Sequence, residues 1–181
     1  MTTALAVLLI TACETPINVV PLEGVSPNFE LHVQAAAAFW NTQVGHGVFK
    51  VQTIDQFVNA KNNQPQIIVT EEPGYGPKSK NAPGIILPVT WASGCLIRAY
   101  VNIYPSVADE HGMDHTKRVR IIAHELGHAL GLKHKGPEDH RQWRLLVMAP
   151  VIPSDATSIG RITESEYEWL RHRYIPRGRH E

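Results

Sequence analysis

Three histidines in residues 124–134 have the types and spacing of ligands to one metal ion. His124 and His128 are four residues apart, so a helix would carry both imidazoles on one face, one turn from each other. His134 lies six residues further on, too far to remain on that face of a straight helix. Gly131 can adopt the left-handed conformation that ends a helix, and so can turn His134 back towards the same ion. Three neutral imidazoles with a fourth position left to water are typical of catalytic Zn²⁺.

Glu125 follows the first of these histidines and adds a chemical function to the site. It can reach a zinc-bound water as a general base without itself binding the metal. A purely structural zinc site needs no base and is usually closed by a fourth protein ligand. The alternative, a buried helix with incidental histidines, would have to account for five fixed positions at once.

The surrounding residues predict a helix over residues 116–130 that positions these side chains. Asp114 or Thr116 offers an N-cap before it. Apolar residues recur at helical spacing and would bury the face behind the ligands: Val119, Ile122, Leu126, Ala129 and Leu130.

The pattern His-Glu-x-x-His-x-x-Gly-x-x-His resembles the zinc signature of the metzincin metallopeptidases. A second feature of that family is a tight turn containing methionine below the zinc site. Residues 146–150 (LVMAP) resemble this turn, with Met148 as its methionine. Pro150 is similar to the matrixin branch, and the tyrosine that some other metzincins have at its position is absent. The resemblance covers roughly residues 17–174, although its specific motifs lie in 124–150.

The N-terminal residues predict export. Residues 1–12 (MTTALAVLLITA) carry no charge, and their apolar core is too short to cross a bilayer as a helix. Residues 10–13 resemble the lipobox of bacterial lipoproteins, in which Cys13 would become the lipid-anchored first residue. The segment is short and lacks a Lys or Arg at its start, so a plain secretory signal and a retained segment remain alternatives. We expect a cell-envelope lipoprotein anchored through Cys13, or else a secreted or periplasmic protein.

A lipidated Cys13 would leave Cys95 with no partner for an internal disulfide. Cys95 begins an apolar strand, where we expect a buried, inert thiol. Matrixins use a cysteine as a fourth zinc ligand in their latent form, but the propeptide motif that carries it is missing here.

The composition is that of a single globular domain: 181 residues, 43% hydrophobic and 19% charged. Lys plus Arg and Asp plus Glu both number 17, so global charge favours neither nucleic acid nor a membrane surface. We expect a monomer that binds no nucleic acid and meets a membrane only through an anchor at Cys13. Residues 13–16 would be a tether, and residues 17–181 the metallopeptidase domain.

Patterns of apolar and turn residues predict the elements around the site. Ser26-Pro27 opens a helix that Gly45 and Gly47 end, and residues 55–64 could hold a short helical turn. Thr163 and Glu166 form a capping box for a last helix from 164 to about 174. Alternation and β-branched residues predict strands at 17–22, 48–54, 66–70, 84–91 and 95–104, of which the last two form a hairpin.

The resemblance implies an α+β fold of the zincin type. It would have a twisted, mixed five-stranded sheet with two long helices, and a small C-terminal subdomain ending in a helix. The N-terminal subdomain would extend to about residue 131, and the C-terminal subdomain would cover 132–181.

The resemblance also gives the strand at 84–91 a function, because the metzincin strand at the cleft edge pairs antiparallel with bound substrate. Pro88 lacks a donor, which an edge strand tolerates, although a covered structural strand is the alternative. The residues implied to contact substrate are Ile85, Ile86, Leu87 and Val89. Residues 151–162 are implied to form the wall of the pocket for the side chain just after the scissile bond.

Residues 105–115 form a polar loop before the zinc helix, in which five side chains could bind a second, structural cation. Their spacing matches no structural zinc or calcium site of the matrixins, so we expect a surface loop and one catalytic Zn²⁺. These side chains are Asp109, Glu110, His111, Asp114 and His115.

Together these observations predict a zinc-dependent endopeptidase that acts on proteins or peptides. His124, His128 and His134 would hold Zn²⁺, and Glu125 would be the general base that activates the attacking water. One alternative is a zinc peptidase or amidase acting on cell-wall peptides. Another is a non-catalytic, zinc-containing module that binds proteins.

Overall fold

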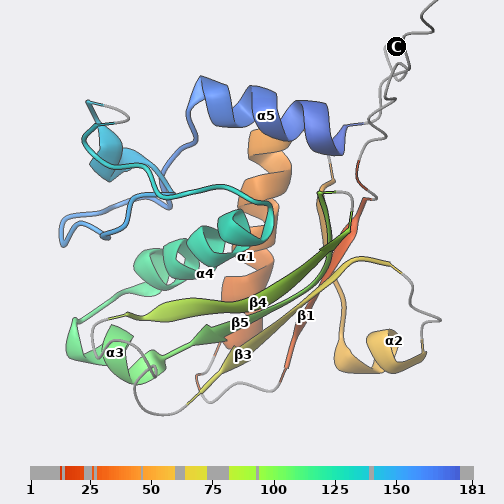
Figure 1. Ribbon diagram of the computed structural model, residues 1–181. Helices are drawn as coiled ribbons and strands as arrows, with labels where there is room; N and C mark the ends of the chain where they lie inside the picture. Colours follow the sequence, from red (N-terminus) through yellow and green to blue (C-terminus); the bar gives the residue numbers. More distant parts are fainter. Residues whose placement is uncertain are drawn as a thin grey trace, which may run out of the picture.

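The computed structural model describes residues 13, 15–22, 26, 28–45, 47–59, 64–72, 82–92, 94–138 and 141–175. Two long helices, α1 (Phe29–Val44) and α4 (His115–Ala129), pack against each other and against a sheet (Figure 1). A further helix, α5 (Glu164–Tyr174), crosses above α1 and follows the irregular segment that succeeds α4.

The sheet of the described residues has five strands in the order β2-β1-β3-β5-β4. Four of them run parallel, and β4 pairs antiparallel with β5 at one edge. The mixed sheet, the hairpin and the edge position of the 84–91 segment were therefore predicted correctly. The strands are β1 (Ile17–Pro21), β2 (Phe49–Val51), β3 (Gln66–Glu71), β4 (Gly84–Ala92) and β5 (Cys95–Ile103).

Three local predictions were wrong in their boundaries. The first helix begins at Phe29 after Asn28, which has a left-handed φ of 71°, so proline does not occupy the first helical position. β2 ends at Val51 because Thr53 and Gln56 bond reciprocally, as in a capping box, and start helix α2 (Ile54–Asn59). The expected loop at 105–115 contains helix α3 (Pro105–Glu110), with proline in its first turn.

Trp40 joins the two long helices. Its side chain is fully buried, and its indole Nε1 donates to the carbonyl oxygen of Ala123 at 2.8 Å. This bond fixes α1 to α4 directly beside the first predicted ligand. The buried Trp40 therefore anchors α4, the helix that carries His124 and His128, to α1.

The predicted free thiol of Cys95 is wrong, because Cys13 and Cys95 form a disulfide. β1 and β5 run parallel, so the residues before β1 and those at the start of β5 lie at the same end of the sheet. The backbone N–H of Cys13 also donates to the carbonyl oxygen of Arg173 in α5 at 2.7 Å. A thioether-linked lipid on Cys13 and this disulfide exclude each other. The predicted signal segment, residues 1–12, lies outside the described residues.

The C-terminal helix follows the prediction closely. Thr163 and Glu166 form both bonds of the capping box at the start of α5. At the other end of α5, the buried Tyr174 hydroxyl donates to the carbonyl oxygen of Leu130, just past α4. α5 thereby supports the turn that leads to His134. Within the described residues, no helix has both the length and the apolarity needed to span a membrane.

Candidate metal centre

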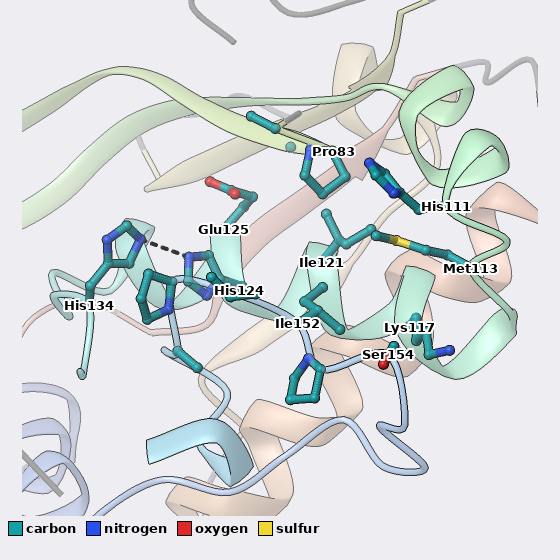
Figure 2. Close-up of a pocket in the computed structure, with 16 residues that line it drawn as sticks. Pro83, His111, Met113, Lys117, Ile121, His124, Glu125, His134, Ile152 and Ser154 are labelled. Atoms are coloured by element: carbon teal, nitrogen blue, oxygen red, sulfur yellow. Dashed lines mark hydrogen bonds between the residues drawn. The ribbon is translucent and has the colours of Figure 1, made fainter. Parts of the chain in front are cut away.

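The structure brings the three predicted ligands together. The Nε2 atoms of His124, His128 and His134 lie 3.1 Å from one another in every pair. Figure 2 shows His124 and His134 facing each other at one end of a pocket, with Glu125 beside them. In the part of the chain that the structure describes, these histidines are the one group of three or more potential metal ligands.

The turn after α4 brings His134 to the other two histidines as predicted. Gly131 has a φ of 92°, which a residue with a side chain adopts only with strain. The N–H of Gly131 bonds to the carbonyl oxygen of His128, and that of Leu132 bonds to the carbonyl oxygen of Gly127. These are the two bonds of a Schellman motif, which ends the helix and reverses the chain.

Backbone carbonyls fix the protonation of two ligands. The Nδ1 atom of His124 lies 2.9 Å from the oxygen of Val147, and that of His128 lies 2.9 Å from the oxygen of Leu132. A carbonyl oxygen only accepts, so each Nδ1 carries the proton and each Nε2 presents a lone pair. These lone pairs point at one another, an arrangement that is repulsive until a cation lies between them.

The triangle of nitrogens fits zinc. Tetrahedral Zn²⁺ with Zn–N distances of about 2.0–2.1 Å needs its nitrogens about 3.3 Å apart. The observed 3.1 Å is close to that value. Burial, followed by the neighbouring His128, lowers the pKa of His124 to about 3. Burial also lowers the pKa of His128, so both imidazoles are neutral at physiological pH, as metal ligands must be.

Glu125 is buried beside the histidines and has altered acidity. Its removal from water raises its pKa to about 7, against the opposing effect of a hydrogen bond from the backbone of Ile86. β4 passes very close to it, because a Cβ on Gly84 would lie 3.2 Å from the Glu125 carboxylate and 2.9 Å from Ile121. Glu125 is therefore enclosed between the zinc helix and the edge strand. A carboxyl group with a pKa near neutrality suits proton transfer in both directions.

Met148, the methionine of the predicted turn, packs against α4 at Gly127. Its side chain is fully buried, and its carbonyl oxygen accepts from the N–H of Lys135 at 2.9 Å. A Cβ on Gly127 would collide with the Met148 sulfur and with Trp40. The methionine turn thus packs directly against the zinc helix between its two ligands.

Two residues that support this packing were missed from the sequence. Gly127 was treated only as a variable position of the motif, and Arg120 was not singled out. Arg120 is buried, and its Nη2 donates to the carbonyl oxygens of Arg144 and Leu146 at 2.8 Å each. It thereby holds the segment entering the methionine turn. The sequence did offer one signal for the role of Arg120. It lies seven residues, or two helical turns, before Gly127, and therefore on the same face of α4.

A cleft of about 700 Å³ opens over the centre between β4 and the segment after Met148. Its wall includes part of the predicted segment 151–162, namely Val151, Ile152, Pro153 and Ser154. Three of the predicted substrate-contacting residues, Ile85, Ile86 and Leu87, are half-buried on the edge strand. The pairing of β4 with β5 is irregular between Leu87 and Thr90, where Pro88 and Val89 fall.

The five candidates for a second cation site do not converge. Asp109 pairs with Arg118, Asp114 caps α4, and the ring of His115 packs on that of His32. Glu110 is exposed at the end of α3, and His111 lines the cleft. No second group of ligands is found among the described residues.

The described residues form a mixed α+β fold, and the three-histidine cluster in it is a candidate metal site. Among solved structures, that of archaemetzincin from Methanopyrus kandleri is similar, with a TM-score of 0.55 and 17% sequence identity. The match covers 93% of this chain and 98% of the archaemetzincin chain. No family model and no curated protein matches the sequence.

Proposed function

We propose that this chain is a zinc-dependent endopeptidase with Glu125 as its general base. The observation that carries the proposal is the convergence of three imidazole Nε2 atoms, 3.1 Å apart, beside a buried carboxyl group. A structural zinc site would need a fourth ligand, and the described residues supply no fourth His, Cys, Asp or Glu to this cluster.

His124, His128 and His134 would hold Zn²⁺, which supplies Lewis acidity and lowers the pKa of a bound water. Glu125 would take a proton from the attacking water and return it to the leaving amine. Burial, which raises the pKa of this carboxyl group to about 7 in the metal-free chain, brings it into the range suited to general acid–base catalysis. The carbonyls of Val147 and Leu132 would keep two ligands in the tautomer that the site requires.

The edge strand supports an extended polypeptide as substrate. β4 has nine residues, and its side away from β5 is unpaired among the described strands. A peptide added to that edge would run past Glu125, because Gly84 lets β4 approach the zinc helix closely. Pairing along such an edge favours cleavage within a chain. It also favours regular L-peptides over cross-linked cell-wall peptides, which remain the second candidate class.

We also propose that the protein is exported, monomeric and closest to the matrixin branch through Pro150. The Cys13–Cys95 disulfide supports export, because such bonds persist mainly in oxidising compartments. An anchor at Cys13 would require this disulfide to be absent. The mass of Cys13-containing peptides from the exported protein would distinguish the two.

The test is cleavage of a diverse peptide library, read by mass spectrometry, with the zinc-loaded full chain and with Glu125→Gln. We expect internal cleavage that falls by about 100-fold or more in the variant, the usual contribution of a general base. Glu125→Gln should still bind one zinc. Absence of cleavage by the wild-type chain with zinc bound would refute an endopeptidase, and cell-wall peptides would then be tested.

A further inference from the structure

An arginine of α5 lies against two tryptophan rings outside the metal centre. The guanidinium carbon of Arg173 is 4.8 Å from the ring centroid of Trp169, one turn earlier in α5, and 5.5 Å from that of Trp91 near the end of β4. At both distances a cation is attracted to an aromatic ring face. Among the described residues, no carboxylate forms a salt bridge with this guanidinium. The two rings therefore stabilise its charge, and we call these three residues the aromatic cluster.

The aromatic cluster packs against the turn that leads to His134. A Cβ on Gly131 would lie 3.0 Å from the Trp169 ring and 3.3 Å from the Trp91 ring, so both rings touch the backbone of the turn closely. Gly131 is the left-handed residue of the Schellman motif and precedes His134 by three residues. The position of that ligand thus depends on contacts made by side chains that do not touch the metal centre.

The same turn serves two of the three ligands. The carbonyl oxygen of Leu132 orients His128, whose Nδ1 lies 2.9 Å away. Among the described residues, by contrast, no group bonds to the Nδ1 of His134, so its orientation depends on the turn itself. A displacement of the turn would therefore move one ligand and loosen the hydrogen bond that orients another.

Arg173 is itself well anchored. Its carbonyl oxygen accepts from the N–H of Cys13 at 2.7 Å, beside the disulfide. A Cβ on Gly94, which lies between β4 and β5, would be 2.8 Å from the Arg173 Nη2. Its backbone is thus fixed to the start of the described chain, and its side chain is enclosed by α5 and the hairpin. An anchored cation between the two rings can keep both of them in place over the turn.

We propose that Arg173 is a positioning residue for the metal centre. By holding Trp91 and Trp169 against Gly131, it keeps His134 within reach of the ion. It acts through the turn and contacts neither the metal nor a substrate. The inference rests on the zinc site of the proposed function, but on no step of peptide hydrolysis.

The first test measures zinc affinity of the full chain by competition with a chromogenic chelator. We expect Arg173→Met, which keeps an apolar side chain but removes the cation, to weaken binding about tenfold, the low end for loss of an outer-shell partner. Loss of stability alone would not weaken it while nearly all of the chain is folded, which urea unfolding checks. Arg171→Met, which removes an exposed arginine paired with Glu168 on the same helix, should leave the affinity unchanged.

The second test asks whether the effect passes through His134. In a His134→Ala background, Arg173→Met should weaken zinc binding by less than about threefold, because the ligand that the aromatic cluster positions is gone. If Arg173→Met does not fold, Trp169→Leu replaces it, since that side chain is 37% exposed. Trp169→Leu should also lose about tenfold, and Trp169→Phe, which keeps a ring face, less than about threefold.

Two results would overturn the inference. One is zinc affinity equal to that of the wild type in a folded Arg173→Met or Trp169→Leu variant. The other is an equal loss in the wild-type and His134→Ala backgrounds, which would show a general structural role. Either result would leave the endopeptidase proposal standing. Conversely, a chain that shows the expected affinities but cleaves no peptide would refute the proposed function and support the inference.

Discussion

At the scale of single residues, the chemistry of the site depends on carbonyl groups as much as on the histidines. The oxygens of Val147 and Leu132 hold protons on the Nδ1 atoms of His124 and His128, and so turn the Nε2 lone pairs inward. The convergence of the three candidate ligands was predictable from their spacing. These carbonyl partners were not, because any residue type can supply a backbone oxygen.

His134 offers a clean test of the metal centre, because its side chain is exposed and contributes little to the core. His134→Ala should weaken zinc binding by more than about 100-fold, since loss of an outer-shell partner alone costs 10- to 100-fold. The free energy of unfolding of the metal-free His134→Ala variant should stay within about 0.5 kcal/mol of that of the metal-free wild type. Competition with a chromogenic chelator measures the affinity.

His172→Ala is the matched control, since His172 is also exposed but lies on α5. Its zinc affinity should equal that of the wild-type chain. Equal affinities for the His134→Ala variant and the wild type would contradict the assignment of His134 as a ligand.

At the scale of elements, the close packing of the methionine turn on α4 makes Gly127 a structural requirement. On helix propensity alone, Gly127→Ala would stabilise the chain by about 1 kcal/mol. Because the added methyl group would meet Met148 and Trp40, we instead expect a loss of about 1–3 kcal/mol. Urea unfolding of the metal-free protein measures the difference.

Gly47→Ala controls for the loss of a flexible residue, because a Cβ there would meet no heavy atom within 4 Å. Its unfolding free energy should change by no more than about 0.5 kcal/mol. A Gly127→Ala variant as stable as wild type, or more stable, would show that the turn does not pack as described.

The elements that were predicted well carry strong local signals. α4 has an apolar stripe and the Asp114 cap, and α5 has the Thr163 capping box. α3 was missed because six residues contain too little periodicity to identify a helix. The start of α1 was misplaced because the left-handed Asn28, and not the preceding proline, begins it. Local patterns therefore predicted the site, but not each of the elements that support it.

At the scale of the whole molecule, the parallel arrangement of β1, β3 and β5 brings Cys13 and Cys95 together across 82 residues of sequence. The cysteine spacing alone could not reveal this, since pairing depends on strand order. The same arrangement leaves β4 at the edge, beside the zinc helix. Strand order was implied by the resemblance, whereas its consequence for the cysteines was not recognised from it.

The disulfide should contribute measurably to stability. Closing a loop of this length stabilises the folded chain by about 4.5 kcal/mol in the chain-entropy model, and by about 2–4 kcal/mol in typical measurements. Cys95→Ser should lose that amount in thermal or urea unfolding, and reductant should bring the wild type to the same value. If Cys13 is instead lipidated, neither Cys95→Ser nor reductant should lower the free energy of unfolding by this amount.

The central claim is that one zinc ion, held by the three histidines, works with Glu125 to hydrolyse peptide bonds. The most direct measurement titrates zinc into the metal-free chain while following cleavage of one quenched fluorescent peptide taken from the library. We predict that activity rises linearly to one zinc per chain, and that Glu125→Gln binds the same amount but remains at least about 100-fold less active. Cleavage by the metal-free chain, or equal activity in the Glu125→Gln variant, would contradict the account.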